Sequence, residues 1–92
     1  MSDDDDYVKI AQKEGTEFME FPIENNGSIL LSTIQAQYQH AIGLKYRSSS
    51  GAWRAIREAN NTLDPPKGGW GSRVYCLTLS GMIILIPIIN NV

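Results

Sequence analysis

Two arginines three positions apart, Arg54 and Arg57, are the residues of this 92-residue chain whose type and spacing best suit the recognition of an anion. A guanidinium group carries a planar fork of N–H donors that fits phosphate and carboxylate oxygens equally well, so the pair alone does not identify its anion. Without further context the two arginines also fit an ordinary solvated surface.

Catalytic and metal chemistry find little support elsewhere in the chain. Cys76 and His40 are the only cysteine and the only histidine, too few to build a zinc site, and no motif pairs the thiol with a base. We expect Cys76 to be a buried, unreactive thiol and His40 a polar residue after a helix. The glycines around Trp70 lack the spacing of a phosphate-binding loop, and we expect Trp70 to lie in the core. The sequence therefore predicts neither an enzyme nor a cofactor.

The charges divide the chain into an acidic front and a basic rear. Residues 1–24 carry eight carboxylates and two lysines, a net charge of −6, whereas residues 45–73 carry six basic and two acidic residues, a net charge of +4. A polyanion attracted by the rear would be repelled by the front, while a second copy of the chain could match both. This division suits self-association.

Composition and chain length predict one small globular domain between two short tails. Of the residues, 42% are hydrophobic and 20% are charged, typical of a folded soluble chain. We expect residues 1–6 to form an acidic disordered tail, residues 7–80 the domain, and residues 81–92 an apolar tail. The acidic start is the reverse of a secretory signal, and the eight-residue apolar run 82–89 is too short to span a bilayer, so we expect a nuclear or cytoplasmic protein that makes no membrane contact.

Hydrophobic periodicity predicts a mixed fold of several strands and one helix. Alternation predicts strands over residues 7–11, 44–47 and 72–79, the last apolar on both faces and therefore central in its sheet. Residues 16–23, rich in aromatic and apolar side chains and stopped at Pro22, are predicted to form another strand. Apolar residues at helical intervals predict one short helix over residues 30–38, with its end marked by Gly43. Residues 60–71, rich in Asn, Pro and Gly, are predicted to be a loop.

Residues 52–58, which carry both arginines, are ambiguous. Their Ala, Arg and Glu content favours a helix, which would place Arg54 and Arg57 on one face, whereas a strand would send them to opposite faces. The residue pattern alone leans towards a helix.

Two longer motifs, "GSILLSTIQAQYQHAIGLKYRSSSGAWRAIR" and "GGWGSRVYCL", resemble the N-terminal domain of the TAR DNA-binding proteins, a nuclear family of RNA-binding splicing regulators. The resemblance covers residues 7–80. A series of short motifs in fixed order is far more specific than any one of them. The matching positions are residues 27–37, Gly43, Leu44, Tyr46, Arg47, Gly69, Trp70, Gly71 and Tyr75.

This resemblance implies a fold and a mode of assembly. The implied fold is α+β, a ubiquitin-like and DIX-like small mixed sheet with one short helix, in which residues 52–58 form a strand. The implied function is head-to-tail self-association, in which an acidic surface of one copy meets a basic surface of the next and supports RNA processing and splicing in the nucleus. Other RNA-processing proteins are further expected partners.

The resemblance also implies which residues would meet. Glu17, Glu20 and Glu24 match the family's acidic interface, Arg54 and Arg57 match its basic pair, and Gln37 matches its interface glutamine. Tyr7 is a candidate for an additional apolar contact. Ser48, Ser49 and Ser50 occupy the place of a phosphorylatable serine and are regulatory candidates.

The chain differs from the family pattern in two regions. The loop before Arg54 is one residue shorter and places Trp53 where the family has a smaller side chain. The family's basic import signal, RNA-recognition motifs and glycine-rich tail are not in this sequence, so we expect a fragment or a truncated isoform. The alternative function is weak RNA or DNA binding through Lys45, Arg47, Arg54, Arg57 and Arg73, although the paired aromatic motifs that stack bases are missing.

Overall fold

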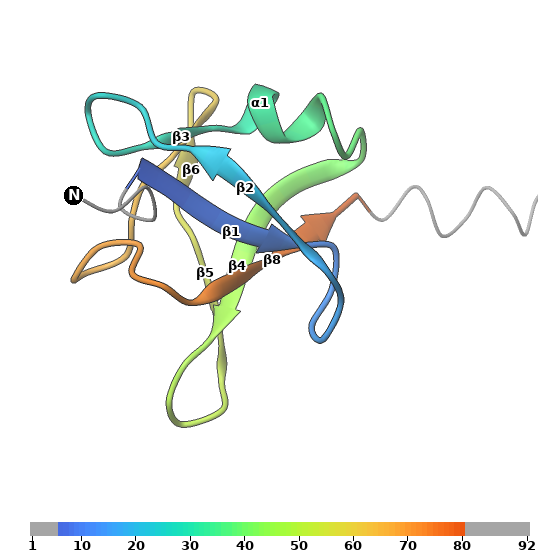
Figure 1. The fold of residues 1–92 in the computed structure, drawn as a ribbon, viewed down its shortest axis with the longest axis vertical. Helices are drawn as coiled ribbons and strands as arrows, with labels where there is room; N and C mark the ends of the chain where they lie inside the picture. The colour runs from blue at the N-terminus through green and yellow to red at the C-terminus, as the bar shows by residue number, and fades with distance from the viewer. Residues whose placement is uncertain (1–5, 81–92) are drawn as a thin grey trace, which may run out of the picture.

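The computed structural model describes residues 6–80 as a curved five-stranded sheet, a small three-stranded sheet and one short helix (Figure 1). Residues 1–5 of the predicted acidic tail and all of the predicted apolar tail lie outside the described residues. The large sheet has the order β2-β1-β8-β4-β5, and the small sheet has the order β3-β7-β6. In the large sheet β2 and β5 are therefore the two edge strands.

The first two predicted strands form an antiparallel hairpin. Strand β1 (Tyr7–Ala11) pairs antiparallel with β2 (Phe18–Pro22), and Val8 lies opposite Phe21 with both side chains buried. Lys9 and Glu20 lie opposite each other on the other face of the hairpin. The alternating pattern thus directs one set of side chains into the core and the other set to the surface.

The last strand is central, as its two apolar faces predict. Strand β8 (Val74–Leu79) pairs parallel with β1 and antiparallel with β4 (Ala41–Arg47), so the sheet is mixed. Tyr75 and Leu77 face the core, and Cys76 is buried on the opposite face. The expected burial of Cys76 is confirmed.

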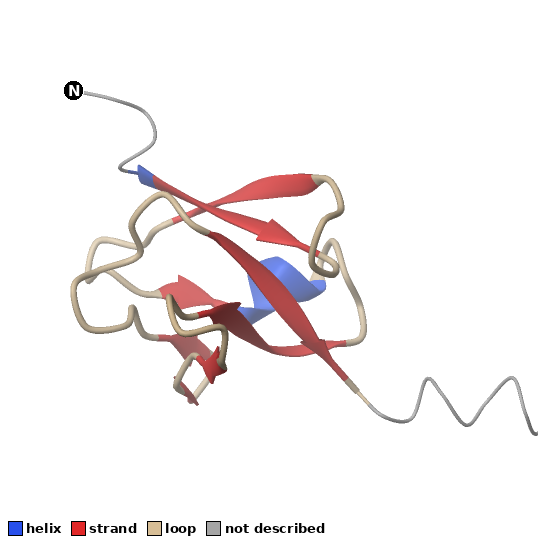
Figure 2. Ribbon diagram, turned by 90° about the horizontal axis from the view of Figure 1, so that it is seen from below, coloured by secondary structure: helices blue, strands red, loops and turns tan. Residues whose placement is uncertain are grey.

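The core lies on the inner face of the large sheet, where the helix and the small sheet cover it (Figure 2). Trp70 closes one end: its indole Nε1 donates to the Gly27 carbonyl oxygen at 2.8 Å, and its own carbonyl accepts a 2.6 Å bond from the Tyr75 hydroxyl. The predicted core role of Trp70 is confirmed. The buried cluster consists of Val8, Ile10, Phe21, Ile29, Leu31, Ile34, Ala41, Leu44, Tyr46, Ile56, Leu63, Trp70, Tyr75 and Leu77.

The helix is shorter than its periodicity predicts. Helix α1 covers only Leu31–Gln35, and Gly43 does not end it but lies inside β4. The Gln35 side-chain amide donates to the Ala41 carbonyl oxygen at 2.9 Å, and the Tyr38 carbonyl accepts from the Ala41 amide at 3.0 Å. These bonds fold the chain directly from α1 into the strand, which starts earlier than residue 44.

The helical prediction for residues 52–58 is wrong, and the strand implied by the resemblance is confirmed for part of the segment. Strand β5 (Trp53–Ala55) pairs antiparallel with β4, placing Trp53 opposite Arg47 and Arg54 opposite Tyr46. The Ile56 amide then donates to the Leu44 carbonyl at 2.9 Å. These sheet hydrogen bonds, together with the burial of Ile56, override the helical propensity of the segment.

A short hairpin replaces part of the predicted loop over residues 60–71. Strands β6 (Glu58–Ala59) and β7 (Thr62–Leu63) pair antiparallel, and β7 also pairs with β3 (Ile29–Leu30). The turn residues Asn60 and Asn61 have φ values of 51° and 70°, the left-handed conformation of a two-residue hairpin turn. The described residues thus form a small α+β ubiquitin-like fold, as predicted.

Candidate functional site

The three predicted interface glutamates follow one edge strand of the large sheet. Glu17 directly precedes β2, Glu20 lies within it, and Glu24 follows it. The seven steps along the chain from the first to the last span about 23 Å at roughly 3.3 Å per extended residue. Glu17 and Glu20 are exposed and Glu24 is half-buried. We call these three residues the acidic edge.

The other two predicted interface residues belong to the same side of the molecule. Tyr7 lies opposite Pro22 in the β1–β2 hairpin and is 41% exposed. Gln37 is exposed in the turn after α1, next to Tyr38, whose ring packs against Phe21 of β2 at 6.2 Å between centroids. The structure therefore places Tyr7 and Gln37 on elements that adjoin the acidic edge.

The two predicted basic interface residues lie at the opposite edge of the sheet. Arg54 is in β5 and Arg57 follows it, and both are exposed on either side of the buried Ile56. We call Arg54 and Arg57 the basic edge. Because β2 and β5 are the first and last strands in the order β2-β1-β8-β4-β5, three strands separate the two edges.

Within residues 6–80, the side chains of both edges have no hydrogen bond or ion pair. The neighbouring arginines, Arg47 and Arg73, differ because their side chains already have partners. Arg47 pairs with Glu14 at 3.3 Å and donates to the Gly51 carbonyl oxygen at 2.7 Å. Arg73 donates to the Tyr75 hydroxyl at 3.1 Å and stacks over the Tyr46 ring at 4.5 Å. The structure thus separates engaged arginines from the unpartnered basic edge.

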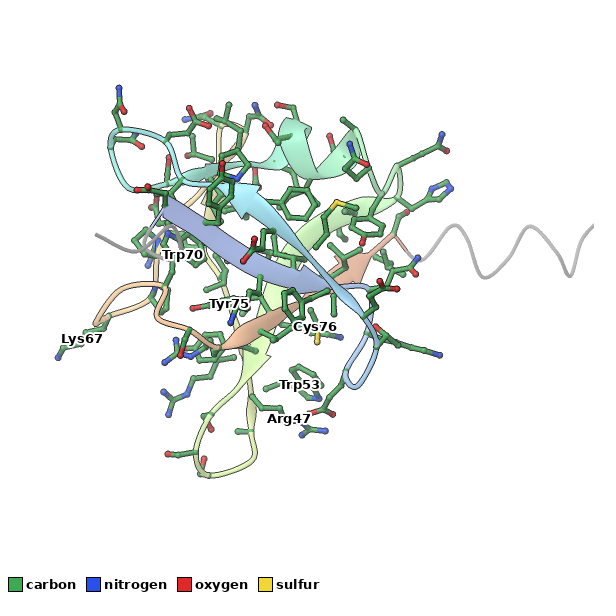
Figure 3. The ribbon with its side chains drawn as sticks, in the orientation of Figure 1. Arg47, Trp53, Lys67, Trp70, Tyr75 and Cys76 are labelled. Atoms are coloured by element: carbon green, nitrogen blue, oxygen red, sulfur yellow. The ribbon has the colours of Figure 1, made fainter. Side chains whose placement is uncertain are left out.

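Trp53 is an exposed aromatic residue beside Arg54 that residue patterns did not assign to the site. Its side chain is 40% exposed, with the Arg47 guanidinium 4.3 Å and the Lys45 ammonium 5.0 Å from the ring centroid (Figure 3). Such cation–π contacts favour this position of the indole by about 0.5–1 kcal/mol each at an exposed site. The only signal for this residue in the sequence is its unusual size at that position of the family pattern.

The serine loop joins β4 to β5 at the end of the molecule away from α1 (Figure 1). Ser48 is half-buried, whereas Ser49 and Ser50 are exposed. The hydroxyls of Ser48 and Ser50 are 2.8 Å apart, and the Ser48 amide donates to the Ala52 carbonyl at 2.8 Å. The three regulatory candidates therefore lie in one tight loop between Arg47 and the basic edge.

A hollow of about 210 Å³ on the outer face of the sheet lies over Cys76, and its other lining residues include Glu14, Arg47 and Trp53. Burial, and secondarily the charge of Glu14, raise the pKa of the Cys76 thiol above its usual value of 9.0. A raised pKa disfavours the thiolate, which is the reactive form. The hollow therefore holds a protonated thiol rather than a nucleophile.

A second and larger hollow, of about 520 Å³, lies at the acidic edge. We call it the Phe18 hollow. Phe18 and Met19 are 45% and 41% exposed, an unusual amount of apolar surface for the start of a strand. The residues that line the Phe18 hollow are Gln12, Thr16, Glu17, Phe18, Met19 and Tyr38.

Metal-binding clusters and membrane-spanning helices do not occur in the described part of the chain. Residues 6–80 hold no group of three or more His, Cys, Asp or Glu residues able to bind a metal ion. No helix in that range is long and apolar enough to cross a bilayer.

Comparison with known proteins agrees with the resemblance seen in the motifs. The family model described as "TAR DNA-binding protein 43, N-terminal domain" matches residues 7–79. Tar DNA-binding protein homolog 1 of Caenorhabditis elegans is 31% identical over 75 residues, which are 78% of this chain and 18% of that protein. The chain thus spans less than a fifth of this relative's length. The chain belongs to the family of N-terminal domains of TAR DNA-binding protein 43.

Proposed function

We propose that this domain is a self-association module in which the basic edge of one copy binds the acidic edge of the next. The observation that supports it best is the position, at opposite edges of one sheet, of arginines and glutamates whose side chains have no partner within residues 6–80. Two different surfaces meeting in this way form a heterologous contact, which adds copies in one direction without closing. The opposite charges of the two edges set the direction in which copies are added.

Ion pairs alone do not supply the affinity. Exposed pairs contribute roughly 0 to 1 kcal/mol each, whereas micromolar association needs about 8 kcal/mol. The remainder must come from apolar and hydrogen-bonding groups near the charges. Tyr7 and Gln37 adjoin the acidic edge and are the nearest predicted contributors.

Nucleic-acid binding is the alternative, and the side-chain contacts favour it less. Of the five cations available, Arg47 and Arg73 are held by hydrogen bonds within the chain, and Lys45 lies over Trp53. Binding a phosphate backbone with them would require breaking these contacts. Enzymatic activity has no support from the side-chain arrangement, and we propose a non-catalytic binding role.

The family membership extends this proposal to the cellular role. We propose that the domain assembles a nuclear protein that regulates RNA processing and splicing, with RNA contacts made by modules outside residues 6–80 and with other RNA-processing proteins as further partners. The domain itself would bind nucleic acid weakly or not at all.

Sedimentation velocity of the full chain over a range of concentrations tests the proposed self-association. We expect the mass to rise steadily past that of a dimer. Arg54→Ala should weaken the association several-fold, whereas Lys67→Ala, which removes an exposed cation that is not part of the basic edge, should leave it unchanged. A chain that stays monomeric up to hundreds of micromolar would overturn the proposal.

The serine loop offers a means of regulation. A phosphate on Ser48, Ser49 or Ser50 adds almost two negative charges next to Arg47 and Arg54 and would compete with the neighbouring copy's glutamates. Replacing the three serines by aspartate should therefore lower the association constant, and replacing them by asparagine should not. Equal association of both triple variants in light scattering would exclude this regulation.

A further inference from the structure

The basic edge carries an aromatic side chain held in place for binding. Trp53 is 40% exposed although Arg47 and Lys45 both contact its ring, at 4.3 and 5.0 Å from the centroid. Arg47 is itself fixed by Glu14 and by the Gly51 carbonyl oxygen. The indole is therefore ordered before any partner arrives, which lowers the entropy lost on binding.

The acidic edge carries a hollow suited to such a side chain. The Phe18 hollow has a volume of about 520 Å³, within the range of small-ligand sites, and combines the exposed apolar groups of Phe18 and Met19 with the ring of Tyr38. A methionine thioether makes favourable contacts with an aromatic ring. Glu17 is part of the lining, so a carboxylate stands beside the apolar surface.

The order of residues connects these two features. Trp53 immediately precedes Arg54, and the Cα atoms of consecutive residues are about 3.8 Å apart. Phe18 immediately follows Glu17, which lines the hollow. When Arg54 of one copy pairs with Glu17 of the next, Trp53 is therefore brought next to the Phe18 hollow.

We propose that Trp53 of one copy inserts into the Phe18 hollow of the next copy and supplies the apolar contact that the ion pairs lack. This inference rests on the proposed head-to-tail association and names the residue that gives it strength and specificity. The occupant is a second copy of this chain because Arg54 beside the aromatic complements Glu17 in the lining of the hollow, while the Lys9 ammonium also lies 5.4 Å from the centroid of the Phe18 ring. A buried aromatic anchor surrounded by charged groups is the usual arrangement of an interface hot spot.

The test uses the full chain and two variants at the proposed contact. Trp53→Ser removes the inserted side chain, and Met19→Asp places a carboxylate in the hollow. Each should weaken association at least tenfold in sedimentation velocity, and the double variant should be no weaker than the stronger single one, since both remove the same contact. Trp53→Phe should retain most of the affinity, and Ile42→Ser, which alters an equally exposed apolar residue elsewhere, should retain all of it.

Tryptophan fluorescence gives a second readout. Its emission wavelength would not change if the variants merely lost apolar surface. Trp53 and Trp70 are the only tryptophans, so in a Trp70→Phe background the emission reports Trp53 alone. It should shift to shorter wavelength as the concentration rises and the indole becomes buried. Urea unfolding of Met19→Asp checks that it folds, and Phe18→Ser replaces it if it does not.

The possible outcomes separate this inference from the proposed function. If the chain associates, and Arg54→Ala weakens this association while Trp53→Ser does not, the proposed insertion of Trp53 is wrong and head-to-tail association stands. If Met19→Asp weakens association but Trp53→Ser has no effect, the hollow binds another group, such as the apolar run 82–89, and the inference is again wrong. If the wild-type chain never associates, the proposed function itself fails.

Discussion

Whether an arginine of this domain can serve a partner depends on what its own chain already offers it. Arg47 is occupied by Glu14 and by a loop carbonyl, and Arg73 by two tyrosines, whereas Arg54 and Arg57 have no such contact within residues 6–80. The sequence predicts all four as basic residues of one segment. The fold separates them into two classes, because it brings Arg47 beside Glu14 of the β1–β2 loop and Arg73, next to β8, over the Tyr46 ring of β4.

The single thiol provides a test of the outer face of the sheet. Because burial and the Glu14 carboxylate raise the pKa of the Cys76 thiol, the reactive thiolate is disfavoured, and its fraction grows only as the pH rises through the elevated pKa. We expect the folded chain to react with a colorimetric disulfide reagent at least about tenfold more slowly than the chain unfolded in urea.

Glu14→Gln is the informative variant for this thiol. It removes the negative charge that raises the pKa and the ion pair with Arg47 beside the hollow, so the reaction of Cys76 should become faster. Glu58→Gln, far along the chain, is the control. Equal rates for the folded and unfolded chain would show that Cys76 is not covered.

The start of α1 is stabilised by another element rather than by its own sequence. Leu30 at the N-cap position provides no side-chain hydrogen bond. Instead, the Asn61 backbone carbonyl accepts from the Leu31 amide at 2.9 Å, and its side-chain carbonyl oxygen accepts from the Ser32 amide at 2.8 Å. The β6–β7 turn therefore caps a helix that is 29 residues away in the sequence.

Substitutions in the β6–β7 turn separate its backbone conformation from its capping role. Glycine tolerates the positive φ of both Asn60 and Asn61, so Asn60→Gly should change the free energy of unfolding by less than about 0.5 kcal/mol. Asn61→Gly also loses two side-chain hydrogen bonds to Ser32 and should destabilise the domain by about 1 kcal/mol, or roughly 4–8 °C in Tm. Equal thermal unfolding of the two variants would contradict the capping role.

Local patterns predicted the elements whose side chains alternate between core and solvent, and missed those defined by distant contacts. Strands β1 and β8 follow from alternation, β2 follows from its aromatic and apolar residues before Pro22, and the central position of β8 follows from its two apolar faces. The β6–β7 hairpin was missed because two-residue strands carry no period, and its stability comes from pairing with β3. The interface residues came from family motifs, whereas Trp53 became visible only through its exposure beside Arg54.

The whole molecule has a net charge of only −2, yet its two edges are of opposite sign. Such attraction depends on salt, because the screening length falls from about 10 Å at 0.1 M to about 3 Å at 1 M. Raising the salt concentration to 1 M should therefore shift the chain toward monomer in light scattering. Association that is indifferent to salt would instead point to the apolar run 82–89, and Ile84→Asp with Ile86→Asp would then abolish it.

Mixing two complementary variants examines the direction of assembly. Arg54→Ala with Arg57→Ala leaves only the acidic edge, and Glu17→Ala with Glu20→Ala leaves only the basic edge. A heterologous contact needs one edge of each kind, so each variant alone should be monomeric at concentrations where the wild-type chain forms long oligomers. Alanine is used rather than reversed charge so that no new attraction arises between the altered edges.

The decisive measurement is the mass of the equimolar mixture in sedimentation velocity, with both variants also carrying Ile84→Asp and Ile86→Asp. This mass shows whether the two edges meet head to tail. Head-to-tail association predicts a heterodimer, because one intact pair of edges remains and neither outer end can add another copy. Oligomers larger than a dimer from either variant alone, or a mixture that stays entirely monomeric, would show that Arg54 and Arg57 do not meet the glutamates of the acidic edge.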